Sequence, residues 1–254
     1  MVDLSGVSAL SAAEYDLQYE PDYAPIVTEH ATDDPELADL LRRREAARRD
    51  AAMLGGSGYE RIEADFYPTP QENVDCALTH VIPQGKIWEP ACGRGDIALR
   101  LMHFGYDTWS SDLHDQGFGA AGMDFFAQTT LPKCGGEPIR SIWTNPPYAT
   151  TPDYPKGMAE AFVRHALDLT EPVKGQVVMF LRNEFDCGKG RMDLFNLPPF
   201  HKKVVVTKRP RWIEGSTGSP RHTYAWFIWD WRHIKGAASI VYSHPSKVSP
   251  VRAS

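Results

Sequence analysis

The chain has 254 residues, 42% hydrophobic and 24% charged, a composition typical of a globular protein with a substantial core. It contains no apolar run of about eighteen residues, which excludes a membrane-spanning helix, and its acidic N-terminus does not resemble a secretory signal. Four scattered cysteines without a Cys-x-x-Cys pair argue against a zinc site and favour a reducing compartment, so we expect a cytoplasmic protein.

The net charge of −6 is unevenly distributed along the chain. Residues 1–70 hold 15 acidic and 6 basic side chains, whereas residues 182–254 hold 5 acidic and 13 basic ones. A basic segment of this kind is either a solvated surface or a phosphate-binding face. The charge alone does not decide between them.

The first 60 residues are expected to form an acidic arm beside the main domain. Residues 1–32 are polar and lack sustained periodicity, as flexible segments do. One helix is predicted from Asp34, where apolar residues recur at helical spacing until Gly55 and Gly56 end the pattern.

From residue 71 onward, predicted helices and strands alternate, which is typical of an open, mostly parallel α/β sheet. Helices are expected at 72–82, 97–102 and 157–169, and strands at 87–88, 108–110, just before 145, at 176–181, 203–207 and 223–229. The last two are expected to form a closing hairpin. The segment 116–138 is loop-rich. We therefore expect one catalytic domain over residues 61–235 and a tail over residues 236–254.

A glycine loop follows the first predicted strand, with the sequence Glu89-Pro90-Ala91-Cys92-Gly93-Arg94-Gly95-Asp96. Its glycines allow the backbone to approach a ligand closely. The spacing Gly93-x-Gly95-x-x-Ala98 also fits a dinucleotide-binding fingerprint, with Asp112 as the acid that binds the ribose, so a nicotinamide dehydrogenase is one alternative. An ordinary strand-to-helix turn, with Asp96 as the helix cap, is another.

A second loop, Asn145-Pro146-Pro147-Tyr148, ends the strand that follows. Two prolines lack N–H groups and fix the backbone, so the carbonyls of Asn145 and Pro146 can point outward as acceptors. A substrate amino group has two N–H bonds to donate, and the Tyr148 ring can stack on the ring that carries it. The alternative is a Pro-Pro turn that only ends a strand.

Together the two loops resemble those of the class I S-adenosylmethionine-dependent methyltransferases, within them the enzymes that methylate adenine N6 in DNA. The glycine loop looks like their cofactor loop, and Asn145-Pro146-Pro147-Tyr148 like their NPPY catalytic loop. The segment Asp65-Phe66-Tyr67-Pro68-Thr69-Pro70 is similar to the one that closes over the methionine end of the cofactor, and Gly122-Met123-Asp124-Phe125-Phe126 to the one that holds its adenine. The resemblance spans about residues 65–230.

The resemblance implies a Rossmann-like, doubly wound sheet with a C-terminal antiparallel hairpin, and S-adenosyl-L-methionine as the cofactor, without a metal. It assigns cofactor binding to Tyr67, Thr69, Pro70, Glu89, Pro90, Ala91, Gly93, Gly95, Asp96, Asp112, Asp124 and Phe125. Ser111 and Asp115 compete with Asp112 for the ribose.

The implied reaction is methyl transfer to the N6 amine of a flipped adenine in double-stranded DNA. Asn145 and Pro146 would hold the amine, Pro147 would stiffen the loop, and Tyr148 would stack on the base. With these loops present, phosphate contacts are expected from the basic segment 182–222, through Arg182, Lys208, Arg209, Arg211 and Arg221.

Several alternatives remain open at this point. Similar loops serve enzymes that methylate adenine or guanine in RNA, or glutamine in proteins, and a non-catalytic nucleic-acid-binding protein could retain the fold. The sequence is compatible with a homodimer. The small size resembles that of phage-type orphan methyltransferases, which places the expected location in the cytoplasm of a bacterial or phage-infected cell.

Overall fold

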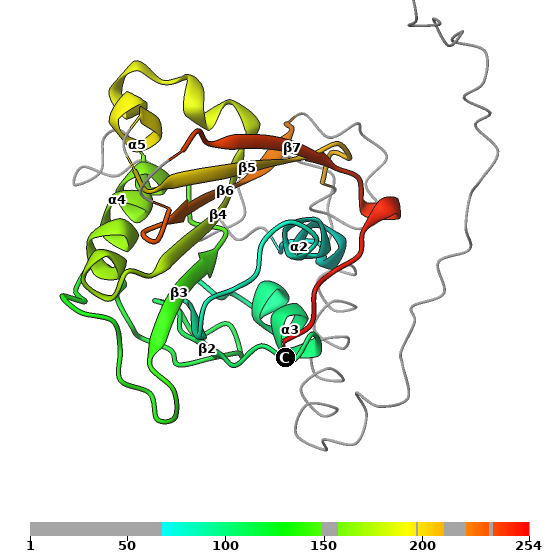
Figure 1. The fold of residues 1–254 in the computed structure, drawn as a ribbon. Helices are drawn as coiled ribbons and strands as arrows, with labels where there is room; N and C mark the ends of the chain where they lie inside the picture. Colours follow the sequence, from blue (N-terminus) through cyan, green and yellow to red (C-terminus); the bar gives the residue numbers. More distant parts are fainter. Residues whose placement is uncertain (1–67, 149–156, 197, 211–221, 234–235, 254) are drawn as a thin grey trace, which may run out of the picture. The chain divides into compact units, whose positions relative to one another are not determined.

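The computed structural model of the chain describes residues 68–148, 157–196, 198–210, 222–233 and 236–253 (Figure 1). The acidic arm over residues 1–60, with its predicted helix, lies outside these ranges, as does Tyr67. Arg211 and Arg221 of the basic segment also lie outside them.

Helices and strands alternate along the described part of the chain. The helices are α2 (Gln71–Leu78), α3 (Asp96–His103), α4 (Met158–Thr170) and α5 (Met192–Asn196), with 3-10 turns at Glu171–Val173, Asn183–Cys187, Lys189–Arg191 and Pro245–Lys247. The strands are β1 (Lys86–Glu89), β2 (Thr108–Ser110), β3 (Ile139–Thr144), β4 (Gln176–Arg182), β5 (Phe200–Val206), β6 (Tyr224–Asp230) and β7 (Ser239–Ser243).

The seven strands of the described residues form one sheet in the order β2-β1-β3-β4-β6-β5-β7. Strands β2, β1, β3 and β4 are mutually parallel, whereas β6 runs antiparallel to both β4 and β5. The prediction of a mostly parallel, doubly wound sheet with a closing antiparallel hairpin is confirmed. The chain order reverses between β1 and β3, and in such sheets ligands bind outside the carboxyl ends of the strands at this point.

Helices cover both faces of the sheet (Figure 1). They bury the central strands, which are apolar on both sides. Strand β6 shows this most clearly. Trp226 and Ile228 pack in one core with α2 and α3, while Phe227 and Trp229 pack in the other core with α4 and α5. Successive side chains of a strand point to opposite faces, so a continuous apolar run implies burial on both. The prediction of a strand over residues 223–229 is confirmed, and this strand is part of the core.

Two segments differ from the sequence-based expectation. Helix α2 ends at Leu78, not near 82, because the residue at 83 is a proline, which lacks an N–H and whose ring clashes with a helical carbonyl four residues earlier, at Thr79. Part of the expected tail forms β7, which pairs in parallel with β5. The chain then returns to the first helices, where the backbone N–H of Val251 donates to the carbonyl of Leu78 at 3.1 Å.

Helices α2 and α3 are joined by an ion pair between Asp75 and Arg100, with both hydrogen bonds at 2.7 Å. The Asp75 side chain is only 8% exposed. We predict that Arg100→Ala lowers the free energy of unfolding by about 3 kcal/mol, because it leaves a buried carboxylate without its partner. Urea titration followed by circular dichroism measures this change.

Asp193→Ala is the matched control, because Asp193 pairs with Arg164 but its side chain is 52% exposed. Exposed pairs contribute little, so this variant should unfold close to the wild-type urea midpoint. Equal midpoint shifts in the two variants would contradict the importance assigned to the buried pair.

Candidate active site

The glycine loop joins the end of β1 to the start of α3. Glu89 is 2% exposed, and its Oε2 accepts a hydrogen bond from the backbone N–H of Ala98 at 2.9 Å. A carboxylate at the N-terminus of a helix satisfies a backbone donor and is stabilised by the helix dipole. Gly93 and Gly95 adopt φ values of 52° and 79°, which other residues rarely tolerate. Glu89 therefore fixes the position of the loop relative to both β1 and α3.

Phe118, which lies beyond β2, packs across this loop. A Cβ atom on Gly95 would lie 2.6 Å from the Phe118 ring. Gly119, the next residue, lies against the end of β2. A Cβ atom on Gly119 would be 2.8 Å from the carbonyl oxygen of Ser110. The sequence analysis did not identify Phe118, because the contact joins residues distant along the chain and no local pattern marks it.

The three candidates for the ribose acid are clearly separated by the structure. Asp112 directly contacts the glycine loop, since its Oδ2 accepts from the backbone N–H of Gly93 at 2.8 Å. Ser111 is fully buried, and its hydroxyl accepts from the Trp88 indole at 2.9 Å. Asp115 and Asp112 each accept from a backbone N–H two residues further on, that of Gly117 and that of His114, but Asp115 is exposed and no hydrogen bond described for it reaches the glycine loop. The geometry therefore favours Asp112.

The segment expected to hold the cofactor's adenine contains one exposed and one buried residue of interest. Asp124 is exposed, and its carboxylate accepts from the backbone N–H of Phe126 at 2.9 Å. Phe125 is 3% exposed and stacks on Phe162 with ring centroids 4.4 Å apart. Phe125 thus supports this segment from the core, and its contact with an adenine ring stays a prediction.

Asn145, directly after β3, contacts the segment that precedes α2. Its Nδ2 donates to the hydroxyl of Thr69 at 3.2 Å, and Thr69 is 3% exposed. Pro70 is the residue before the first turn of α2. The structure therefore brings together two motifs, separated by 76 positions, that the sequence analysis placed at one site.

Tyr148 ends the catalytic loop and is held by β4 and β6. Its hydroxyl donates to the carbonyl of Phe180 at 3.0 Å, and its ring meets Tyr224 edge-on with centroids 6.5 Å apart. The guanidinium carbon of Arg182 lies 5.6 Å from the centroid of the Tyr148 ring. Burial raises the pKa of the Tyr148 hydroxyl well above its ordinary value, so this group stays a hydrogen-bond donor at neutral pH.

Three of the predicted phosphate-binding residues, Arg182, Lys208 and Arg209, lie in the described part of the chain and are exposed. Arg182 is the last residue of β4, and Lys208 and Arg209 follow the carboxyl end of β5. The two strands point the same way because both run antiparallel to β6. Lys203 differs from them. It is 7% exposed and donates to Asp186 and to the carbonyl of Asn183, both at 2.7 Å, so it anchors the loop after β4.

Comparison with protein-family models and with curated proteins gave no match. Among solved structures, a Listeria monocytogenes protein assigned to the class I S-adenosylmethionine-dependent methyltransferases matches with a TM-score of 0.55 at 12% identity, over 83% of this chain and 74% of that one. A modification subunit assigned to a type I restriction enzyme of Vibrio vulnificus matches with a TM-score of 0.51 at 12% identity, over 83% and 52%. A chain from a type I restriction–modification system matches with a TM-score of 0.52 at 14% identity, over 86% and 51%.

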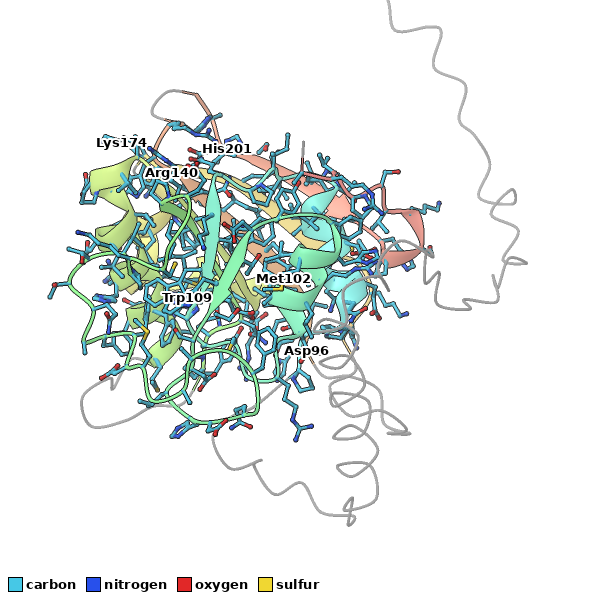
Figure 2. All side chains as sticks on the ribbon, turned by 90° about the horizontal axis from the view of Figure 1, so that it is seen from below. Asp96, Met102, Trp109, Arg140, Lys174 and His201 are labelled. Atoms are coloured by element: carbon cyan, nitrogen blue, oxygen red, sulfur yellow. The ribbon has the colours of Figure 1, made fainter. Side chains whose placement is uncertain are left out.

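The chain has the fold of the class I methyltransferases. At these identities the likeness concerns the fold, and the chain spans about half the length of the two restriction–modification chains. In this fold the glycine loop and the Asn145–Tyr148 loop follow β1 and β3 at one edge of the sheet. Figure 2 shows Asp96 and Trp109 near this edge, well apart from Arg140, Lys174 and His201 at the opposite one.

The described residues contain neither a metal-ligand cluster nor a membrane-spanning helix. No group of three or more His, Cys, Asp or Glu side chains there is placed to bind a metal ion. No helix in the same ranges has the length and apolar character needed to cross a bilayer.

The close contact of Gly95 with Phe118 leads to a testable difference between two glycines. Gly95 and Gly117 have nearly equal φ values of 79° and 80°, but a Cβ on Gly117 would have no atom within 4 Å. Both alanine variants carry a backbone cost of about 1–2 kcal/mol. Only Gly95→Ala must also displace Phe118. We predict a larger loss of unfolding free energy for Gly95→Ala, measured by urea titration, and equal losses would contradict the packing described here.

Proposed function

We propose that the protein is an S-adenosylmethionine-dependent methyltransferase that acts on the N6 amine of a flipped adenine in DNA. The observation that carries this proposal is the placement of the Asn145-Pro146-Pro147-Tyr148 loop. It follows β3, the strand adjacent to β1, whose own carboxyl end carries the glycine loop. A cofactor loop and an amine-binding loop at one sheet edge suit the transfer of a small group between two bound ligands.

The residues around the glycine loop fit S-adenosylmethionine by their chemistry. The ligand offers ribose hydroxyls, amino groups and a positive charge, for which carboxylates are suitable partners. Asp112 lies against Gly93 and is placed to accept from the ribose, while Asp124 is the acceptor for the adenine end. Glu89 and Thr69 shape the loop and the methionine end. When bound, S-adenosylmethionine would supply a methyl group activated by its positively charged sulfur.

Asn145 and Pro146 are proposed to bind the target amine. The lone pair of an exocyclic adenine amine is delocalised into the ring, so the nitrogen is a weak nucleophile. Two N–H hydrogen bonds, to the Asn145 amide oxygen and the Pro146 carbonyl, favour a more tetrahedral nitrogen. The hydrogen bond from Asn145 Nδ2 to Thr69 fixes the orientation of the amide before the amine arrives. Such preorganised acceptors stabilise the charge that develops on the nitrogen.

Tyr148 is proposed as the stacking platform for the base. Its hydroxyl is already bound to the Phe180 carbonyl and its edge rests on Tyr224, so the ring is ordered without substrate. Ordering a side chain in advance removes an entropic cost from binding. An adenine in a duplex is paired and stacked, so it must be flipped out to reach this ring.

A nucleic acid is favoured over a protein substrate by the exposed basic side chains at this edge of the sheet, Arg182, Lys208 and Arg209. Phosphate contacts supply most of the sequence-independent affinity for nucleic acids, whereas a glutamine side chain needs none. Two of the matching structures belong to type I restriction–modification systems, which supports DNA over RNA.

The proposal is tested by offering labelled S-adenosylmethionine with double-stranded DNA, RNA and protein in parallel. We predict label in DNA, recovered as N6-methyladenine after digestion to nucleosides. Label confined to RNA or protein would keep the methyltransferase activity but overturn the DNA assignment. Retention of nicotinamide dinucleotide, with no S-adenosylmethionine binding by calorimetry, would overturn both.

Asn145→Ala tests the amine-binding role. We predict a fall in kcat of about 10²–10³-fold, the usual cost of removing one preorganised hydrogen-bonding group from a transition state. The dissociation constant for S-adenosylmethionine should stay near the wild-type value. Asn196→Ala, at an exposed position at the end of α5, is the control and should retain full activity. Full-rate methylation by Asn145→Ala would contradict the mechanism.

Tyr148 also allows a test by pH. Because burial raises the pKa of this hydroxyl above about 10, its hydrogen bond to Phe180 is present at lower pH and is lost only as the pH rises past that raised value. We therefore predict that wild type and Tyr148→Phe have the same pH profile of kcat between about pH 7 and 10. Tyr148→Ala should lose most activity throughout. An alkaline decline below about pH 10 in wild type alone would contradict the burial of this hydroxyl.

A further inference from the structure

The guanidinium of Arg182 lies over the ring of Tyr148, the residue proposed to stack on the target base. Its carbon is 5.6 Å from the ring centroid, within the range of about 6 Å in which a cation and an aromatic face attract each other. The same ring packs against both hydrophobic cores and is bound at its hydroxyl by Phe180. Tyr148 is partly buried and Arg182 is exposed, so the contact between them lies at the surface of the domain.

Hydrogen bonds hold the backbone at Arg182, whereas the contact described for its side chain is the one with the Tyr148 ring. Arg182 pairs with Tyr224 across β4 and β6, and the next backbone N–H, that of Asn183, donates to the carbonyl of Thr223 at 2.9 Å. The buried Lys203 donates to the carbonyl of Asn183 at 2.7 Å. Within the described part of the chain no ion pair holds the guanidinium. The side chain can therefore swing away while its Cα stays in place.

A planar guanidinium and a planar purine compete for the same face of a ring. We infer that Arg182 covers the base-stacking face of Tyr148 before substrate binds, and that the entering base displaces the guanidinium onto the phosphate of the flipped nucleotide. This inference rests on the proposed function. Arginine suits both positions, because guanidinium stacks on aromatic rings and also forms paired hydrogen bonds with phosphate.

The exchange makes Arg182 a residue that determines substrate class. When a base without a phosphate binds, the contact between Arg182 and Tyr148 is broken and no phosphate contact of Arg182 replaces it. A nucleotide replaces that contact with a phosphate contact. The site is thereby biased toward nucleic acid and against uncharged amines and amides, even though Asn145 and Pro146 would accept hydrogen bonds from either.

The test compares wild type, Arg182→Ala and Arg182→Lys in methylation of unmethylated plasmid DNA, with deoxyadenosine and dAMP as competitive inhibitors. For Arg182→Ala we expect kcat/KM on DNA to fall about tenfold, with the slope of log(kcat/KM) against log salt reduced by about one. The inhibition constant of deoxyadenosine should fall about threefold, as expected when an exposed cation–π competitor is removed. The wild-type preference for dAMP over deoxyadenosine should disappear.

Arg182→Lys separates the two roles. Lysine keeps the charge but lacks the planar group, so the salt slope on DNA should stay near wild type while deoxyadenosine inhibits more strongly. Arg140→Ala is the matched control, since Arg140 is also exposed but lies at the opposite edge of the sheet, where it donates to the carbonyl of Val173 (Figure 2). It should alter neither the salt slope nor the inhibition constants.

The outcomes are distinguishable. If Arg182→Ala weakens DNA methylation and deoxyadenosine inhibition together, Arg182 has only a structural role and the inference is overturned, while the proposed function stands. An unchanged inhibition constant for deoxyadenosine also overturns it. If wild type transfers no methyl group to DNA, the proposed function fails, and this inference with it.

Discussion

The parallel register of β1, β3 and β4 is the constraint on which the rest of the structure depends. Trp88 of β1 pairs with Ile142 of β3, and Ile142 pairs with Val177 of β4. These pairings bring the carboxyl ends of the three strands to one edge of the sheet. The glycine loop follows β1, the Asn145–Tyr148 loop follows β3, and Arg182 is the last residue of β4. A shift of one residue in any of these strands would move each of its side chains to the opposite face of the sheet and into the other core.

Buried polar side chains then connect the loops to this frame. Glu89 joins β1 to α3, Thr69 joins the start of α2 to Asn145, and Lys203 supports the chain after β4. Each of these groups is at least nine-tenths buried and satisfies a specific partner. Because a buried polar group without a partner is costly, such contacts allow few alternative positions for the loops they bind. The site is therefore rigid in its backbone, and motion is left to side chains such as Arg182.

Much of the fold and part of the site could be predicted from the sequence. Alternating helices and strands predicted the parallel sheet, and the glycine and proline loops stood out because their residues constrain the backbone locally. Local signals did not identify Phe118 or β7, because each is defined by a contact with a distant segment. Lys203 also lies within the basic segment 182–222, but its side chain is buried and forms an ion pair with Asp186. Net charge along a chain does not distinguish a surface lysine from one that supports a loop.

The return of the chain after β7 has a consequence for how the domain is assembled. Residues near the C-terminal end of the described chain bind α2 and the turn before β2, through Leu78 and Tyr106. Helix α2 also packs near β5 and β6, which lie much later in the chain and are therefore synthesised after it. The packing of α2, the first helix of the described chain, is therefore complete only when the segment around Val251 is in place. During synthesis, the proposed cofactor loop would therefore emerge long before the segment around Val251 that stabilises its side of the sheet, and this side would reach its final structure only after that segment has emerged.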